Sequence, residues 1–473
     1  MSLFDATVHG LRARVRSLRT DMELWIDRAS AGGDLRQHHT QLTRLHDFIG
    51  GTLTAVVAGR PINPDADPPF SGTVNDVPGL RRSVGSVHLL WDFYRDKLAQ
   101  RDVHAFADHL GAADDLAWAC YQPFLTAATE SPDRRFDTAQ VKEPPLVFYS
   151  TDRTPFAQAR TKTLHPPGLD AKDVGEFLAA LQRLPVPVIG LPWEVANRMP
   201  ETALVGHEAG HVIAEDLGLA AEARKAVQEA SLNGDRDGVR KKVWLAWCDE
   251  VFADVIGVLA TGTAFVEGLT AELAGEPSEI RQATINPEKP GKYPTPMLRV
   301  ALCERVLAGI GVAPSTAWSA EYGEIVGQSR DYRDDVAVVA SALLGRTWEA
   351  VDGKRLRELL PWDAVREEQA RTVARTTLNR EPAPVPFDVR VWVAAAMHAY
   401  LDKPVTYAKR DLDRALATHI VTQRAEGVRS SRSMREPLIV RRRGPQAPAT
   451  HDEQLREADR QAGAELARRL GIG

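Results

Sequence analysis

Cysteine is scarce in this 473-residue chain. Its three cysteines, Cys120, Cys248 and Cys303, are an odd number and lie in apolar or mixed stretches with helical spacing. A disulfide framework needs paired cysteines and an oxidising environment, so the pattern argues against one. We therefore expect the protein to fold in a reducing compartment.

Long apolar runs are missing as well. A helix needs roughly 20 successive apolar residues to span a bilayer, and the most apolar run, residues 251–264, is interrupted by Asp254. The first ten residues lack the basic and apolar regions of a signal peptide. The sequence therefore predicts a protein that is not embedded in a membrane and that stays in the cytoplasm.

An excess of positive charge is also absent. The 59 Lys and Arg are outnumbered by 64 Asp and Glu, which gives a net charge of -5, so no nucleic-acid partner is expected. The sequence contains no internal repeat, phosphate-binding glycine loop or nucleophile elbow. Its content of 44% hydrophobic and 26% charged residues is typical of an ordinary globular protein.

Helical spacing dominates the N-terminal part of the chain. Apolar residues recur at intervals of four and three from Phe4 to Trp25, and the spacing resumes from Leu35 to Ile49 after a break that contains two glycines. Two such segments predict an antiparallel helical hairpin. We interpret the seam as packing within the protein rather than as a partner-binding coiled coil, because each arm is short.

The pattern changes near residue 144. Residues 146–149 and 186–189 are short, partly β-branched apolar runs bounded by prolines, and helical spacing is present between them at 171–184. Helical spacing then dominates from 200 to about 427, with interruptions at two proline-containing loops. The predicted fold class is mainly α with a small β-sheet (α+β).

A metal-binding motif lies in one of the helical segments. In His207-Glu208-Ala209-Gly210-His211 the two histidines are four residues apart, so a helix presents both to a single ion. A catalytic zinc ion takes three protein ligands and keeps an open position for water, whose pKa it lowers toward about 7. Glu208 lies beside the histidines and is the expected general base.

The sequence around the motif predicts a buried helix. Apolar residues precede and follow it at 203–205 and 212–214. Gly206 and Gly210 each cost about 1 kcal/mol of helix propensity relative to alanine, which suggests that another backbone, or the site itself, comes close to them. The competing interpretation of the pentapeptide is two surface or capping histidines beside an incidental glutamate.

A third ligand is expected from residues 247–257. Glu250 and Asp254 are four residues apart on an otherwise apolar helix, where two carboxylates are costly unless they are paired or bind a metal. Glu250 is the expected ligand, and Asp254 is expected to accept a hydrogen bond from the far nitrogen of a ligating histidine. Salt bridges to a neighbouring helix are the alternative for this pair, and Asp249 is the alternative ligand.

His-Glu-x-x-His followed by Glu-x-x-Ala-Asp resembles the gluzincin zinc peptidases, particularly the family of the CAAX-processing endopeptidase and its bacterial heat-shock relatives. In that family His-Pro, four further residues and Arg-Ile close the site. The segment Tyr293-Pro294-Thr295-Pro296-Met297-Leu298-Arg299-Val300 has the same spacing, with tyrosine in place of the histidine. The resemblance covers residues 200–300. The transmembrane helices of those relatives are absent from the sequence, so processing of membrane proteins is not implied.

The resemblance implies a zincin-like catalytic core, flanked by helical regions, that holds one Zn²⁺ ion. The expected parts are a helical N-terminal region with the hairpin at 1–140, the metallopeptidase core at 141–330, a C-terminal helical region at 331–430, and a basic linker with a terminal helix at 431–473.

Other residues are candidates for supporting roles. The hydroxyl of Tyr293 is a hydrogen-bond donor for the oxyanion that forms during peptide hydrolysis. Arg299 is expected to anchor Asp254 or a substrate carboxylate, with a helix–helix contact as the alternative. His398 is a second candidate for transition-state stabilisation, although such a histidine is more often a core residue. Residues 158–165 are expected to form a strand edge that pairs with an extended substrate.

The sequence thus predicts a zinc-dependent endopeptidase that acts on a protein or peptide substrate. The alternatives are a catalytically silent, zinc-stabilised regulatory or interaction protein and a helical scaffold with an accidental motif. Glu208 favours the enzyme, because a structural zinc site needs no base and prefers a fourth protein ligand. The helical regions around the core suggest a hypothesis in which a trigger or a regulatory protein partner gates the activity.

Overall fold

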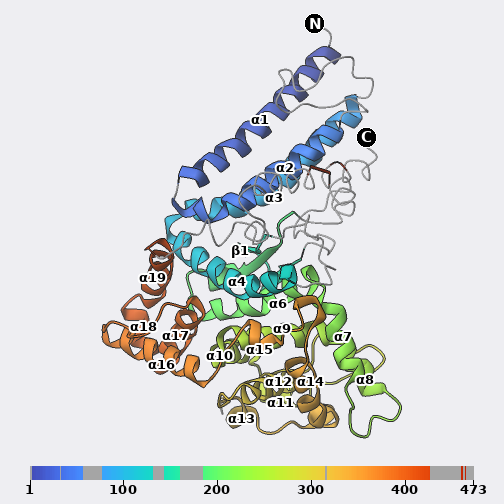
Figure 1. Cartoon of the computed structure of the whole chain (residues 1–473), viewed down its shortest axis with the longest axis vertical. Coiled ribbons are helices and arrows are strands. Elements are labelled where there is room, and N and C mark those ends of the chain that lie inside the picture. Colours follow the sequence, from blue (N-terminus) through green and yellow to red (C-terminus); the bar gives the residue numbers. More distant parts are fainter. Residues whose placement is uncertain are drawn as a thin grey trace.

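The computed structural model describes residues 3–31, 33–56, 77–130, 143–159, 185–314 and 317–426, together with residues 460, 461 and 464. Over these residues the protein is mainly helical with a three-stranded sheet, which confirms the predicted balance of helix and strand. Figure 1 shows an elongated arm of helices above a broader helical body, with the sheet between them.

The arm consists of α1 (Leu3–Ala31), the short 3-10 helix η1 (Gly33–His38), α2 (His39–Val56) and α3 (Val77–Ala99). The predicted seam is buried at Val8, Leu11, Val15, Leu18, Met22, Trp25, Leu35, Leu42, Leu45 and Ile49. Helix α3 lies against both α1 and α2 and completes their hydrophobic core. The hairpin is therefore confirmed, and its seam packs within the protein.

The strands are β1 (Leu146–Ser150), β2 (Phe156–Gln158) and β3 (Val188–Pro192). The first and third pair in parallel, the second pairs antiparallel with the third, and the order is β1-β3-β2. Side chains alternate between the two faces of a strand. Leu146 and Phe148 accordingly join the core of the arm, whereas Val147 and Tyr149 join the core of the body. The sheet thus separates two hydrophobic cores and is covered on both faces.

Part of the sequence prediction lies outside the described residues. Strand β2 ends at Gln158 and forms one edge of the described sheet, so residues 158 and 159 of the predicted substrate edge are described and residues 160–165 are not. The predicted helix at 171–184 and most of the basic linker with its terminal helix at 431–473 are also outside the described residues.

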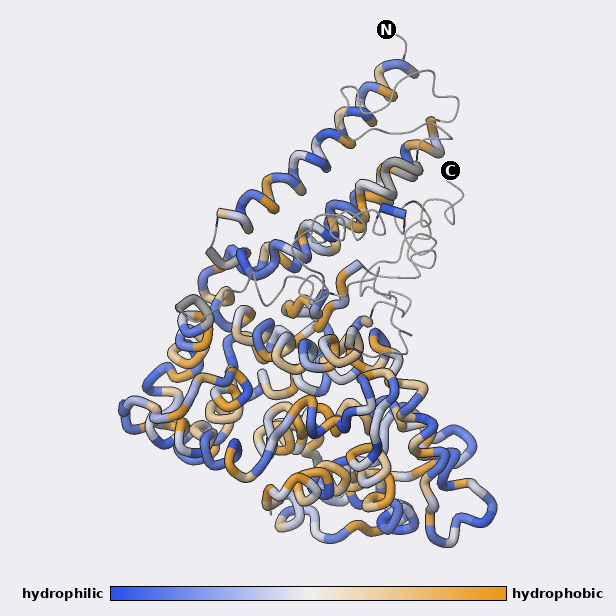
Figure 2. The backbone as a smooth tube through the Cα atoms, viewed as in Figure 1, coloured by the Kyte–Doolittle hydropathy of each residue, from blue (hydrophilic) through white to orange (hydrophobic). Residues whose placement is uncertain are grey.

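The body contains α4 beneath the sheet and the helices that follow the sheet (Figure 1). Their bounds are η2 (Gln100–Asp102), α4 (His104–Glu130), η3 (Trp193–Val195), η4 (Pro200–Leu204), α6 (Val205–Asp216), α7 (Leu219–Glu229), α8 (Val239–Ala246), α9 (Cys248–Thr261), α10 (Thr263–Leu273), α11 (Pro277–Arg281), α12 (Pro296–Gly309), α13 (Ala317–Tyr322), η5 (Gly327–Tyr332), α14 (Arg333–Gly345), η6 (Glu349–Val351), α15 (Leu356–Leu359), α16 (Ala364–Asn379), α17 (Val389–Asp402), α18 (Pro404–Lys409) and α19 (Leu412–Glu426). Figure 2 shows hydrophobic segments in the middle of this body and hydrophilic segments at its periphery.

Tyr322 and Tyr332 lie at the ends of α13 and η5, and both side chains are buried. Tyr332 packs its ring 5.7 Å from that of Trp247, and the Tyr322 hydroxyl bonds to the backbone of Gly275. Both tyrosines therefore have structural contacts within the body.

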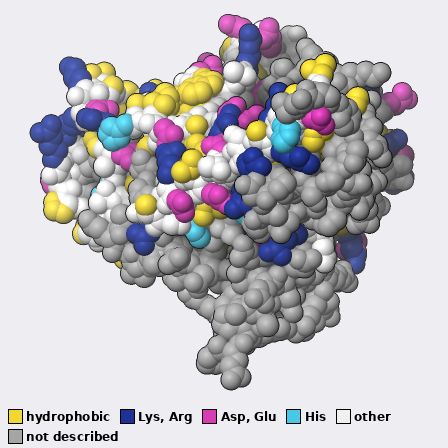
Figure 3. Space-filling model, turned by 90° about the horizontal axis from the view of Figure 1, so that it is seen from above, with side chains coloured by type: hydrophobic (Ala, Val, Ile, Leu, Met, Phe, Trp, Pro, Cys, Tyr) yellow, Lys and Arg dark blue, Asp and Glu magenta, His cyan; other side chains and the backbone are white. Residues whose placement is uncertain are grey.

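The predictions made from composition can be compared with the structure. All three cysteines are buried and free. Within the described part of the chain, every helix is too short or too polar to cross a bilayer. Figure 3, which views the molecule from above the arm, shows Lys and Arg side chains interspersed with Asp and Glu over the described part of that face.

Helices α6 and α9 pack closely at the centre of the body. A methyl group at Gly206 would lie 2.8 Å from Ala260 Cβ, and one at Gly210 would lie 2.9 Å from Ala253 Cα. Carbon atoms in contact are normally about 3.5–4.0 Å apart, so the contact has no room for a side chain at either glycine. The predicted close approach at these glycines is confirmed, and the backbone that approaches is that of α9.

We predict that Gly210→Ala lowers the free energy of unfolding by about 1–3 kcal/mol, because the new methyl group would meet Ala253 and Ile256. Gly10→Ala in α1 is the matched control, since nothing lies within 4 Å of that position and alanine should stabilise the helix there by about 1 kcal/mol. Urea denaturation followed by circular dichroism measures both. If the Gly210 variant were as stable as the wild type, the close packing would not constrain the helix pair.

Candidate metal centre

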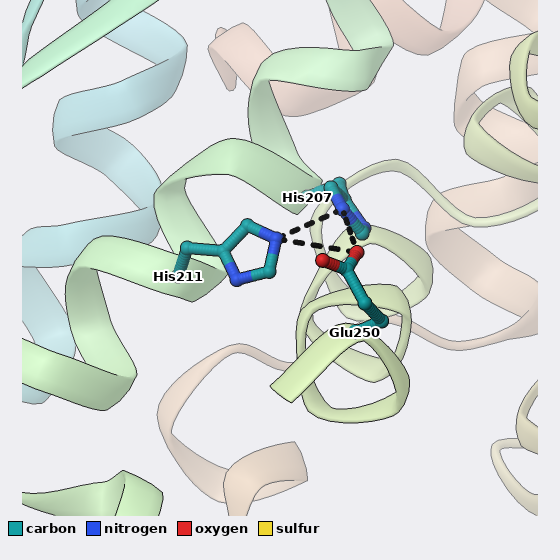
Figure 4. A group of neighbouring side chains, drawn as sticks. All are labelled: His207, His211 and Glu250. Atoms are coloured by element: carbon teal, nitrogen blue, oxygen red, sulfur yellow. Dashed lines mark hydrogen bonds and ion pairs between the residues drawn. The ribbon is translucent and has the colours of Figure 1, made fainter. Parts of the chain in front are cut away.

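Helices α6 and α9 bring three side chains with metal-binding atoms together. His207 and His211 extend from one face of α6, and Glu250 extends from the first turn of α9. Figure 4 shows the three side chains pointing toward one another, and their ligand atoms lie within 4.8 Å of one another. His207 and Glu250 are buried, and the His211 side chain is 12% exposed. The site therefore lies inside the body, and His211 is its most exposed member.

The spacing of the three atoms fits a tetrahedral ion. His207 Nε2 lies 3.2 Å from His211 Nε2, and Glu250 Oε2 lies 3.3 Å from the first nitrogen and 3.4 Å from the second. Ligand atoms that are each about 2.0–2.1 Å from a tetrahedral zinc ion lie about 3.3–3.4 Å from one another. The chemistry and separation of these three residues therefore fit the protein ligands of a catalytic zinc ion.

The Glu250 carboxylate provides an independent observation. Both of its oxygens are buried, and neither accepts a hydrogen bond of normal geometry from the described residues. Lys292 Nζ lies 2.8 Å from Oε1, whereas Oε2 faces the two histidines. A metal ion would be held between Oε2 and the two imidazoles.

Asp254 lies one turn further along α9 and contacts the far side of His207. Its Oδ1 is 2.8 Å from His207 Nδ1, which leaves Nε2 of that ring facing the site. Arg299 of α12 donates to both oxygens of Asp254, from Nε at 2.7 Å and from Nη2 at 2.8 Å. Two parallel bonds of this kind fix the orientation of a carboxylate. Asp254 therefore has the predicted contact with a histidine, and the salt bridge proposed as its alternative is present too.

Asp249, the alternative ligand, points elsewhere. Arg224 donates from Nη2 to both of its carboxylate oxygens, at 2.9 and 2.8 Å. Of the two adjacent acidic residues, Glu250 is thus the one that faces the histidines.

The charges of the site shift the pKa values of its members. Burial lowers the pKa of His207, but the hydrogen bond and charge of Asp254 and the contact with Glu250 raise it to about 9. Burial raises the pKa of Glu250, whereas the two histidines hold it well below its ordinary value. Burial likewise raises the pKa of Asp254, and Arg299 and His207 together lower it below the usual range. In the metal-free protein at pH 7, His207 is therefore an imidazolium beside two carboxylates.

Glu208, the predicted base, is buried in the first turn of α6. It forms no hydrogen bond or ion pair with any other residue that the structure describes. Charged partners compensate Glu250 and Asp254, whereas Glu208 has no such partner among the described residues.

Tyr293 lies at the rim of the site. Its side chain is 48% exposed, its ring lies 5.4 Å from the guanidinium carbon of Arg299, and its hydroxyl accepts a hydrogen bond of 3.0 Å from Lys292 Nζ. Its hydrogen bonds and ring contacts with described residues include neither histidine nor Glu208. The structure therefore places the tyrosine near the site without joining it to the ligands directly.

Lys292 and Phe265 are site residues that the sequence analysis misses. Lys292 Nζ lies 2.8 Å from Glu250 Oε1, and the one sequence signal for it is its position just before the third motif. Phe265 of α10 stacks on the His207 ring at a centroid distance of 6.1 Å. A side chain at Gly257 would collide with that phenylalanine, and nothing in the sequence predicts the contact.

His398 belongs to a different cluster. Its Nε2 lies 3.1 Å from Glu367 Oε1, and Glu367 also accepts hydrogen bonds from Trp362 and Thr263. The histidine therefore has a structural contact with Glu367, as expected of a core residue.

Glu250→Gln is predicted to weaken zinc binding because it removes the anionic ligand atom. The loss should exceed the 10–100-fold that is typical when a residue that hydrogen-bonds to a metal ligand is replaced. Asp249→Asn is the matched control, since the neighbouring carboxylate is bound to Arg224. Competition with a chromogenic chelator gives both dissociation constants. Zinc affinity that fell in the Asp249 variant and not in the Glu250 variant would move the ligand by one position.

Zinc binding at pH 7 is predicted to release about one proton from the protein. The pKa of His207 in the metal-free protein is about 9, so its imidazole must lose a proton before Nε2 can bind a metal. The release should decline as the pH approaches about 9, where the unbound histidine is itself partly neutral. Calorimetric titration in buffers of different ionisation enthalpy measures the release, and a buffer-independent heat at pH 7 would be inconsistent with a protonated His207.

Comparison with protein-family models, with curated proteins and with solved structures finds no match for this chain. The functional interpretation consequently depends on the motifs of the chain and on the geometry of its own residues.

Proposed function

We propose that this protein is a zinc-dependent endopeptidase with the ligand arrangement of the gluzincins. The observation that carries the proposal is the triangle of His207 Nε2, His211 Nε2 and Glu250 Oε2, whose sides of 3.2 to 3.4 Å suit a tetrahedral ion. Glu208 is on the same helical turn and has no hydrogen-bond or ion-pair partner among the described residues. It is therefore available as a base, which favours a catalytic over a structural zinc site.

His207, His211 and Glu250 would hold the ion. When bound, zinc supplies a Lewis acid that makes water a nucleophile at neutral pH and polarises the peptide carbonyl. Asp254 keeps the His207 ring in the orientation in which Nε2 faces the site, and Arg299 in turn fixes Asp254.

Glu208 carries the proton transfers. Its carboxylate accepts a proton from the attacking water as the water oxygen adds to the carbonyl carbon of the peptide bond. When the C–N bond breaks, Glu208 returns that proton to the leaving amine nitrogen. Tyr293 is the proposed donor to the carbonyl oxygen, because a phenol hydroxyl at the rim can hydrogen-bond the negative charge that develops there.

The proposed substrate is an unfolded protein segment or a peptide. An extended chain can add to the open edge of a sheet through its backbone, and β2 is an edge strand of the described sheet that lies against α6. We further propose a cytoplasmic location and, because helices cover much of the core, control by a regulatory protein partner.

The silent zinc-stabilised protein is the competing function. Structural zinc sites have four protein ligands, whereas the cluster formed by the described His, Cys, Asp and Glu side chains has three members. The number of ligands therefore favours catalysis.

Glu208→Gln is expected to keep zinc bound and to lower kcat for cleavage of a denatured protein by about 10²–10⁴-fold, because the amide cannot accept the proton from water. Glu229→Gln on α7 is the control, since that carboxylate is exposed and its ion pairs are with Lys225 and Arg346. Metal analysis and a cleavage assay are run on the same samples. Full activity of the Glu208 variant would remove the base from the mechanism, and an inactive wild type that binds zinc would favour the silent protein.

A further inference from the structure

Lys292 connects the two parts of the site that the sequence motifs leave separate. It ends the loop at 286–292, and its side chain is 67% exposed. Its Nζ nevertheless reaches the buried Glu250, at 2.8 Å from Oε1, and the Tyr293 hydroxyl, at 3.0 Å. A single ammonium group therefore contacts a proposed metal ligand and the proposed oxyanion donor.

The contact divides the two oxygens of Glu250 between different partners. Oε2 faces the imidazole nitrogens of His207 and His211, and Oε1 faces Lys292. A carboxylate whose second oxygen is held by an ammonium group presents one oxygen to a metal and not two. Since a tetrahedral zinc ion with three protein ligands has one position left for water, a second carboxylate oxygen would compete for that position.

The contact with Tyr293 determines the direction of a hydrogen bond. An ammonium group has three donors and no acceptor, so the phenol oxygen must be the acceptor in its bond with Lys292. The phenol proton is then free to point to another acceptor. The positive charge of the lysine also makes that O–H a stronger donor, which is the property that an oxyanion donor needs.

A surface ion pair does not account for this arrangement. Exposed Lys–Glu pairs contribute little and have no fixed geometry, but here the Glu250 side chain is 2% exposed and is held on its other side by two histidines. Lys289, in the same loop, is exposed and offers a direct comparison.

We propose that Lys292 is a positioning residue of the peptidase site: it holds Glu250 through Oε1 so that Oε2 alone faces the metal, and it orients the Tyr293 hydroxyl as a donor to the substrate. This inference rests on the proposed function, because it assigns a role relative to the zinc ion and to the oxyanion.

The test compares the wild type with Lys292→Met, Lys292→Arg and Lys289→Met, each loaded with Co²⁺ in place of Zn²⁺. The visible absorption of Co²⁺ is strong in four-coordinate sites and weaker at higher coordination numbers, so it reports the geometry of the site without any turnover. We expect Lys292→Met to weaken the absorption and, in the zinc form, to lower kcat about 10–100-fold with little change in KM. Lys292→Arg should restore both, and Lys289→Met should match the wild type.

Tyr293→Phe tests the second contact. If Lys292 orients the phenol, removal of the hydroxyl should lower kcat by a smaller factor in the Lys292→Met background than in the wild type. The two changes then act on one interaction. Additive losses would overturn this part of the proposal.

The outcomes separate this inference from the proposed function. A wild type that takes up neither Zn²⁺ nor Co²⁺ would defeat both. A wild type that binds metal and cleaves protein, together with a Lys292→Met variant that has the same cobalt spectrum and the same kcat, would overturn the role of Lys292 alone. Reduced activity that Lys292→Arg fails to restore, with an unchanged spectrum, would also overturn it, and circular dichroism of each variant excludes misfolding as the cause.

Discussion

The close approach of α6 and α9 is the constraint on which the rest of the site depends. Helix pairs usually lie about 8–10 Å apart, and the side chains at their contact set the distance. Here the contact residues of α6 are Gly206 and Gly210, so the backbones come together without a side chain of α6 between them. Glu250 on α9 can then reach the imidazoles one helix away. The two glycines lower the helix propensity of α6, but they allow a close approach of the two helices that bulkier residues would prevent.

Much of the fold follows from local periodicity, and the remainder follows from contacts between distant segments. The 3-and-4 spacing from Phe4 to Trp25 predicts a helix with one buried face, because that pattern needs no knowledge of the partner. It does not predict that α3 (Val77–Ala99) covers the hairpin. The runs at 146–149 and 186–189, from which strands are predicted, are apolar at successive positions, and such runs do not reveal which residues face which core. The division of the sheet between the arm and the body therefore becomes known only from the structure.

The same distinction applies to the site. The histidine pair and the pair of Glu250 and Asp254 each follow the four-residue repeat of a helix, so their side chains share a face whatever the tertiary fold. Lys292 lies in a loop, where no repeat fixes the direction of a side chain, and its contact with Glu250 depends on the path of the whole loop. The position of Tyr293 illustrates this limit, because the motif spacing places it near the site but the loop turns its hydroxyl toward the lysine. Sequence patterns thus predict the proposed ligands on helices better than the groups that surround them.

The charges around the site also bear on Glu208, the carboxylate that forms no hydrogen bond or ion pair with a described residue. Two permanent cations, Arg299 and Lys292, balance the carboxylates of Asp254 and Glu250. A doubly charged ion that displaces one proton from His207 adds one net positive charge to a buried region, where an uncompensated charge is costly. The buried carboxylate of Glu208, on the same helix as the two histidines, offsets part of that positive charge. The residue proposed as the base would thus also offset part of the charge of a bound metal ion, and glutamine in its place would remove both the proton acceptor and that negative charge.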